Sequence, residues 1–303
     1  MTQDRLVFFG TDAFSVPALI RLLAEERNVV AVVTKPDSRT GRGQGLTPPA
    51  VKVLAASRKI PVLQPTKVGE IEDQLTQLKP DAGIVVAYGK IIPQKILQIF
   101  PKGLLNIHPS LLPTYRGATP IETAILNGDD ETGVTLMQLD AGMDTGPTYD
   151  MTKVQLVGTE TRLELNERLA EIGAQLLSDK LTDALSGNIV PIPQARAKAS
   201  VTHLMRKQDG DIDWSKPAFQ LEREVRAYLG WPGSRTTING IVVTITASHA
   251  TGGSGNPGTA FKTPSGELAI YSGSGSLVID LLKPAGKREM TGAQFLTGHP
   301  IKA

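Results

Sequence analysis

Two polar residues stand two positions apart in a short apolar segment. Asn106 and His108 lie at the carboxyl end of the run LLNI at 104–107, whose composition predicts a buried strand. Side chains alternate between the two faces of a strand, so these two point to the same side, roughly 7 Å apart. An asparagine amide donates a hydrogen bond to an oxygen that becomes negative, and a neutral histidine accepts a proton from a nucleophile. The pair is therefore a candidate site for acyl transfer.

A carboxylate follows the next strand-like segment, 134–139. Asp144 lies in a loop flanked by Gly142 and Gly146, and it can orient a histidine or relay its proton. Aspartates in glycine-rich loops are also common as plain turn residues, and single histidines at strand ends are often structural. The residue types alone therefore leave both interpretations of Asn106, His108 and Asp144 open.

Other catalytic arrangements find less support. Ser110 suggests a Ser-His-Asp hydrolase, but no G-x-S-x-G motif surrounds it. The chain has no Cys, and His203, His249 and His299 show no ligand spacing. The segment 209–214 resembles the start of a calcium loop but lacks the closing Glu. We expect no metal.

The elements that position these residues follow a strand-then-helix rhythm. Buried strands are predicted at 6–9, 29–33, 84–86 and 104–107, separated by helical patterns, which is typical of a doubly wound, mostly parallel α/β sheet of Rossmann-like type. Ligands then bind at the carboxyl ends of the strands. Thr161 and Glu164 form a capping-box pattern that opens a long amphipathic helix, which Gly187 ends.

The composition changes after that helix. A Pro-Ile-Pro run at 191–193 and small polar residues predict a linker at 190–206, between a catalytic domain at 1–189 and a second domain at 207–303. Asn239 and Gly240 predict a type I′ hairpin turn between two short strands. With the glycine-rich connections that follow, the pattern favours a small, OB-like β-barrel.

Composition excludes several classes of protein. The 303 residues carry 32 Lys and Arg against 30 Asp and Glu, a net charge of +2, and are 40% hydrophobic and 20% charged. These values are typical of a folded globular chain of about two domains. No apolar run approaches the roughly 18 residues of a membrane span. The first ten residues show no signal peptide, so we expect a cytoplasmic protein without a membrane partner.

The motif around the candidate site is specific. Asn106-Ile107-His108-Pro109-Ser110-Leu111-Leu112-Pro113-x-x-Arg116-Gly117, followed by Gly133-Val134-Thr135 and Asp144-x-Gly146, resembles the signature of the folate-dependent formyltransferases. The resemblance implies that Asn106, His108 and Asp144 are the catalytic trio. It also implies that Ser110, Leu111, Leu112 and Pro113 line the pocket for 10-formyltetrahydrofolate, the formyl donor.

Within this superfamily, the chain resembles the enzymes that act on methionyl-tRNA. The similar segments are 8–14, 34–37, 212–214 and 231–233, so the resemblance spans both domains, whereas the purine-pathway enzymes match only the first. It implies initiator methionyl-tRNA as acceptor, and we expect a monomer. A formyltransferase for a nucleotide-linked amino sugar stays an alternative, because those enzymes share both domains. A non-catalytic RNA-binding protein is the other alternative, and the intact trio argues against it.

The segment 35–49 distinguishes the tRNA interpretation. Its glycines follow G-x-G-x-G, which fits neither a dinucleotide fold nor a P-loop, and we expect an exposed, mobile loop. Arginine forks on such a backbone suit phosphate contacts. The resemblance places this loop at the tRNA acceptor end and assigns Arg42 first, then Lys35 and Arg39, with Lys207 as a further tRNA contact. A solvated surface loop is the alternative. In the second domain, further basic residues extend the track or are ordinary surface charges: Arg206, Arg223, Arg226 and Arg235.

Overall fold

The computed structural model describes residues 3–40 and 45–301, so Arg42 lies outside the described residues. The chain forms two compact units that interleave in sequence. The first unit comprises Met1–Pro120, Glu131–Gln155 and Asn166–Thr202, and the second comprises Ile121–Asp130, Leu156–Leu165 and His203–Ala303. Among the described residues, no helix has the length and hydropathy to cross a membrane.

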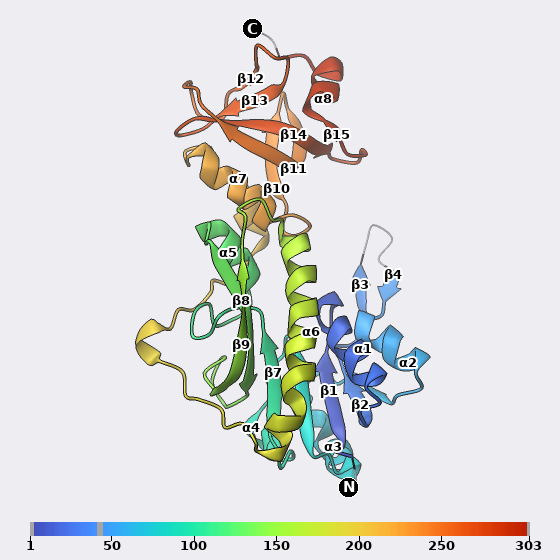
Figure 1. The fold of residues 1–303 in the computed structure, drawn as a ribbon. Helices are drawn as coiled ribbons and strands as arrows, with labels where there is room; N and C mark the ends of the chain where they lie inside the picture. Colours follow the sequence, from blue (N-terminus) through green and yellow to red (C-terminus); the bar gives the residue numbers. More distant parts are fainter. Residues whose placement is uncertain (1–2, 41–44, 302–303) are drawn as a thin grey trace. The chain divides into compact units, whose positions relative to one another are not determined.

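A seven-stranded sheet forms the centre of the first unit (Figure 1). The strand order is β5-β2-β1-β6-β7-β8-β9; the first five strands are parallel, β8 runs antiparallel to β7, and β9 runs antiparallel to β8. This confirms the doubly wound, mostly parallel sheet. Central strands such as β1 are continuous apolar runs because helices cover both of their faces. The strands are β1 Leu6–Gly10, β2 Val29–Val33, β5 Val62–Leu63, β6 Ala82–Val86, β7 Leu104–His108, β8 Glu131–Gln138 and β9 Thr148–Gln155.

Different helices cover the two faces of β7, the strand that carries the polar residues. On one face, Gly173 of α6 lies against Ile107, and its missing side chain lets the helix approach closely. On the other face, Leu104 packs in an apolar cluster with residues of α3 and α4. Asn106 and His108 share the side of Leu104 by alternation. The first five helices are α1 Val16–Ala24, α2 Ala50–Ser57, α3 Glu72–Leu78, α4 Gln94–Leu97 and α5 Pro120–Asn127.

The long helix α6, Arg162–Ser186, begins and ends as expected. The Thr161 amide donates to the Glu164 carboxylate at 2.9 Å, and the Glu164 amide donates to Thr161 Oγ1 at 3.3 Å, which confirms the capping box. Gly187 follows the helix with a left-handed φ of 77°. The apolar stripe of α6, including Leu169 and Leu176, is buried.

The segment 35–49, expected to be an exposed, mobile loop, contains regular structure. Its described residues form a two-stranded antiparallel ribbon, β3 Ser38–Thr40 with β4 Gly45–Thr47. Main-chain hydrogen bonds build such a ribbon without an apolar pattern, and Leu46 is 69% exposed. At its base, hydrogen bonds from Gln64 and Lys52 hold the pKa of Asp37 below its ordinary value. The described residues of the segment are therefore exposed or partly exposed, and they include regular strand pairing.

An antiparallel sheet forms the second unit and confirms the small barrel-like domain. Its main order is β10-β11-β14-β13-β12, with β15 paired to β14, and it closes as a half-barrel over α7 and α8. The predicted hairpin turn is confirmed, because Asn239 and Gly240 have φ values of 50° and 76°. The elements are α7 Ala218–Ala227, β10 Ser234–Ile238, β11 Ile241–Thr251, β12 Ala260–Lys262, β13 Leu268–Tyr271, β14 Ser276–Pro284, β15 Met290–Thr291 and α8 Gly292–Gly298.

Candidate active site

The carboxyl end of β7 carries the two polar residues. Asn106 is 8% exposed and His108 is 4% exposed, with β6 on one side and β8 on the other. The Asn106 side chain makes no hydrogen bond to any other residue that the structure describes. Buried amides are normally paired, so an unpaired one at a strand end is a donor available to a ligand.

The ring of His108 is oriented by a main-chain group. Its Nε2 lies 2.8 Å from the carbonyl oxygen of Tyr115. A carbonyl oxygen only accepts hydrogen bonds, so we assign the proton of the neutral ring to Nε2 and the lone pair to Nδ1. Nδ1 lies 3.8 Å from Asp144 Oδ2. A proton taken up at Nδ1 would therefore sit opposite a carboxylate.

Asp144 reaches this position through an unusual backbone conformation. Its φ is 52°, in the left-handed region that non-glycine residues seldom adopt. Its Oδ2 accepts a hydrogen bond of 2.8 Å from the Gly117 amide, and its side chain is 17% exposed. Nearby, Gly146 packs so closely on the Gln138 carbonyl that a Cβ would collide. The fold thus brings Asp144 beside His108 from a separate loop.

The segment 110–113 is held by internal hydrogen bonds. Ser110 Oγ donates to the Thr114 carbonyl at 2.6 Å, so it is engaged away from the His108 ring nitrogens. Thr135 Oγ1 donates to the Ser110 carbonyl and accepts from the Leu112 amide. Ser110 and Leu112 are 1% and 4% exposed, whereas Leu111 and Pro113 are partly exposed. Ser110 and Leu112 therefore support the loop, and Leu111 and Pro113 can offer surface to a ligand.

Comparison with known proteins decides the family. The formyl transferase model matches residues 4–181, and the formyl transferase C-terminal domain model matches residues 204–300. The methionyl-tRNA formyltransferase of Myxococcus xanthus is 43% identical over 303 residues, which cover 99% of this chain and 97% of the relative. This chain belongs to the methionyl-tRNA formyltransferase family.

Solved structures of more distant proteins share the fold. The N-formyltransferase from Helicobacter canadensis, in complex with folinic acid and dTDP-3-aminofucose, is 20% identical with a TM-score of 0.69, covering 95% of this chain and all (100%) of that chain. HypX from Aquifex aeolicus, in complex with tetrahydrofolic acid, is 18% identical with a TM-score of 0.69 and covers 97% of this chain. The chain spans about half of HypX, 47% of its length. At this level of identity, the likeness extends to the fold alone.

Main-chain groups of residues 115–117 complete the site of this methionyl-tRNA formyltransferase family member. The Tyr115 carbonyl and the Gly117 amide contact His108 and Asp144, and sequence reasoning missed both because any residue supplies these groups. It also missed Gln194, whose side chain bonds to the backbone of the Asp144 loop from within the predicted linker. In the sequence, the Arg116-Gly117 pair of the motif was the one sign that residues 115–117 belong to the site.

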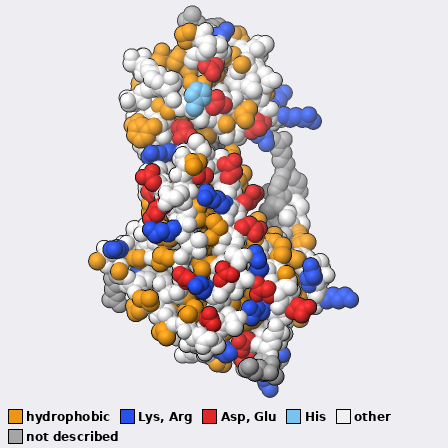
Figure 2. Space-filling view, in the orientation of Figure 1, with side chains coloured by type: hydrophobic (Ala, Val, Ile, Leu, Met, Phe, Trp, Pro, Cys, Tyr) orange, Lys and Arg blue, Asp and Glu red, His pale blue; other side chains and the backbone are white. Residues whose placement is uncertain are grey.

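The expected tRNA contacts of the family lie at exposed or partly exposed positions. Arg39 and Lys207 are exposed, and Lys35 is partly exposed beside Gly89. None of these three side chains forms a hydrogen bond or ion pair with a residue that the structure describes. Arg42, the first choice, lies outside the described residues. On the face drawn in Figure 2, Lys and Arg side chains are interspersed with Asp and Glu, in keeping with the net charge of +2.

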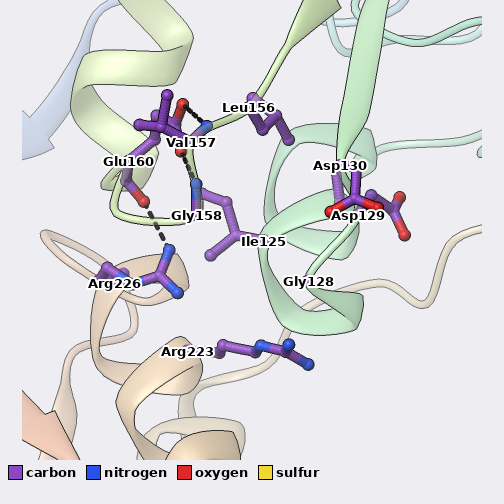
Figure 3. A pocket seen from close by; sticks show the side chains of 11 residues that line it. Ile125, Gly128, Asp129, Asp130, Leu156, Val157, Gly158, Glu160, Arg223 and Arg226 are labelled. Carbon is purple, nitrogen blue, oxygen red and sulfur yellow. Dashed lines mark hydrogen bonds between the residues drawn. The ribbon is translucent and has the colours of Figure 1, made fainter.

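The other arginines of the second unit are engaged in internal contacts. Figure 3 shows Arg223 and Arg226 at a pocket of about 190 Å³ formed by α5, α7 and the turn at 156–160. Arg226 forms a bidentate ion pair with Glu222 at 2.6 and 3.0 Å and donates to the Glu160 carbonyl at 2.9 Å. Arg223 donates to the carbonyl of Asn127 at the end of α5. Arg235 pairs with Asp211 at 2.8 Å. These contacts favour a structural role for the three arginines over a tRNA track.

Proposed function

We propose that this enzyme transfers the formyl group from 10-formyltetrahydrofolate to the α-amino group of methionyl initiator tRNA, giving N-formylmethionyl-tRNA for translation initiation. The observation that carries the proposal is the 43% identity with a methionyl-tRNA formyltransferase across both units. The gathering of Asn106, His108 and Asp144 at one strand end supports it. The amino-sugar alternative has weaker support, since the nucleotide-sugar enzyme is 20% identical.

The residues present fit an acyl donor of this kind. The unpaired, nearly buried amide of Asn106 suits an oxygen that gains negative charge. Leu111 and Pro113 would contact the folate from their partly exposed positions, and Ser110 and Leu112 would hold the segment in place. When bound, the donor supplies a one-carbon electrophile attached to a nitrogen atom.

The geometry supports the following transfer step. Asn106 donates a hydrogen bond to the formyl oxygen as the amine nitrogen attacks the formyl carbon. His108 accepts the amine proton at Nδ1, and Asp144 stabilises the charged ring from 3.8 Å. His108 returns that proton to the departing folate nitrogen as its bond to the formyl carbon breaks. One carbon-nitrogen bond forms and one breaks, and no oxidant or reductant is needed.

The tRNA would be held outside this cluster. Lys35, Arg39 and Arg42 of the segment 35–49, with Lys207, are the proposed phosphate contacts, and the exposed side chains of Arg39 and Lys207 support this. We further propose a catalytic domain at 1–189, a linker at 190–206 and a tRNA-assisting domain at 207–303. The proposed enzyme is a monomer that acts in the cytoplasm and needs no metal.

A labelling experiment tests the function directly. The protein is incubated with labelled 10-formyltetrahydrofolate, total charged tRNA and a nucleotide-linked amino sugar, and the labelled products are separated. We expect the label on the methionine of initiator tRNA. Label on the sugar, or on no acceptor at all, would overturn the proposal.

A further inference from the structure

Residues 194–202, here called the strap, lie along the loop at 114–117, which follows the segment 110–113. The Arg116 amide donates to the Ser200 carbonyl at 2.9 Å, and the Thr202 amide donates to the Arg116 carbonyl at 2.8 Å. The Tyr115 amide donates to Ser200 Oγ at 2.9 Å. All of these residues belong to the first unit. The strap is therefore part of the packed structure around the candidate site.

The loop that the strap holds contacts both acid-base groups. Tyr115 offers its carbonyl to His108 Nε2 at 2.8 Å, and Gly117 donates its amide to Asp144 Oδ2 at 2.8 Å. A shift of this loop would move the histidine ring and the carboxylate together. Whatever fixes residues 115–117 thus fixes the relative position of the two side chains.

Gln194 connects this loop to the turn that carries Asp144. Its Nε2 donates to the carbonyls of Asp144 at 2.9 Å and Gly146 at 2.7 Å. Its Oε1 accepts from Arg116 Nε at 3.0 Å and from Nη2 at 2.7 Å. Both N–H donors and both acceptor positions of one carboxamide are used. A carboxylate, a cation or a hydroxyl side chain of the same length cannot offer two N–H donors and two acceptor positions together.

The turn needs such a constraint. Asp144 has a left-handed φ of 52°, which persists only when the surroundings fix it. We propose that Gln194 is a positioning residue for formyl transfer, which holds the turn at 144–146 so that the Asp144 carboxylate stays opposite His108 Nδ1. This inference rests on the proposed function, because it assumes the roles given there to His108 and Asp144.

Replacement of Gln194 by methionine tests the role. Gln194→Met keeps the length of the side chain and removes all four hydrogen bonds. We expect kcat to fall about 10- to 100-fold, as for a displacement of about 1 Å in a catalytic group. KM for tRNA and for the folate donor should stay within about twofold. A loss of kcat with KM retained distinguishes a displaced catalytic group from weaker substrate binding.

Gln175→Met is the matched control. Gln175 is exposed on α6 of the same unit, and among the described residues its Nε2 donates only to Asp179, at 2.7 Å. The same chemical change there should leave kcat unaltered. A role of Gln194 in stability alone would lower the unfolding midpoint without lowering kcat of the folded enzyme.

Gln194→Glu provides a second variant. It still accepts from Arg116 but places carboxylate oxygens against the two carbonyls, so kcat should fall at least as far as in Gln194→Met. It decides the matter if Gln194→Met does not fold. A folded variant with kcat within about twofold of the wild type, or failure of both variants to fold, would overturn the positioning role. Wild-type formylation in the same assay separates this outcome from failure of the proposed function, which would leave the wild type inactive as well.

Discussion

The candidate catalytic cluster and the β3–β4 ribbon, both in the first unit, are built in opposite ways. Asn106, His108 and Asp144 are at most 17% exposed, and main-chain groups of Tyr115 and Gly117 bond to the side chains of His108 and Asp144. In the ribbon, Arg39 is exposed and bonds to no other described side chain, and Leu46 is 69% exposed. The proposed function gives the two regions different tasks: transfer chemistry needs fixed dipoles, and tRNA binding needs adaptable cations.

Fixed groups stabilise a transition state because they do not have to reorganise when charge develops. A cation that meets an irregular RNA surface gains more from freedom to adjust, although ordering a long side chain costs about 0.5–1.5 kcal/mol on binding. Mutations in the cluster should therefore change kcat, and mutations in the ribbon should change KM for tRNA and its salt dependence. Four experiments test this division.

The largest effect is expected from Asn106→Ala. Loss of one oxyanion donor typically lowers the rate about 10²- to 10³-fold, and we expect this loss in kcat with KM little changed. Because the Asn106 side chain is unpaired among the described residues, the fold should be retained. Single-turnover formylation measures the rate, and the thermal midpoint monitors folding. A rate near that of the wild type would remove Asn106 from the mechanism.

Arg39→Ala should act on binding. Loss of one charge-assisted phosphate contact should raise KM for tRNA about 5- to 10-fold at low salt. The log-log salt slope should fall by about one, while kcat at saturating tRNA stays unchanged. Lys153→Ala is the matched control, since Lys153 is an exposed cation of the same unit that pairs with Glu131 at 3.0 Å. An equal effect in both variants would show a general charge effect and break the comparison.

The cluster was largely predictable because its signals are local. The apolar run around Asn106 and His108 fixes a buried strand, and alternation fixes their common face. The capping box at Thr161 and the turn at Asn239 were equally local and are confirmed. The meeting of Asp144 with His108 came from the family resemblance, because its loop is separated from β7 by a helix and a strand.

Other parts of the site had no sequence signal. The Tyr115 carbonyl and the Gly117 amide are backbone groups, so residue type does not reveal them. Gln194 lies 78 residues after its partner Arg116, in a stretch whose composition is that of a linker. The pairing of β3 with β4 rests on main-chain hydrogen bonds, which leave no periodic pattern in the side chains. Each omission concerns a contact that only tertiary structure creates.

Arg226→Ala tests whether the paired arginines of the second unit differ from Arg39. Arg226 loses a bidentate ion pair whose partners are 13% and 21% exposed, and a bond to the Glu160 carbonyl. We expect a loss of about 1–2 kcal/mol in the free energy of unfolding, with KM for tRNA and the salt slope unchanged. Urea denaturation measures the first, and formylation kinetics the second. A salt slope lower by about one would mean that Arg226 contacts phosphate after all.

Glu122→Gln should have the smallest effect. It measures how much stability is lost by burying a carboxylate that has no proposed catalytic role. Burial raises the pKa of Glu122, and Arg162, 4.0 Å away, only partly offsets this. A raised carboxyl pKa contributes stability at low pH that is lost as pH rises through the folded-state value. The glutamine variant, which stays neutral, should match the wild type in acid and gain about 1–2 °C in Tm at neutral pH. Its kcat should be unchanged, in contrast to a neutral substitution at Asp144. A lower Tm at neutral pH would mean that attraction to Arg162 outweighs desolvation. The stability of the second unit would then also depend on a buried charge.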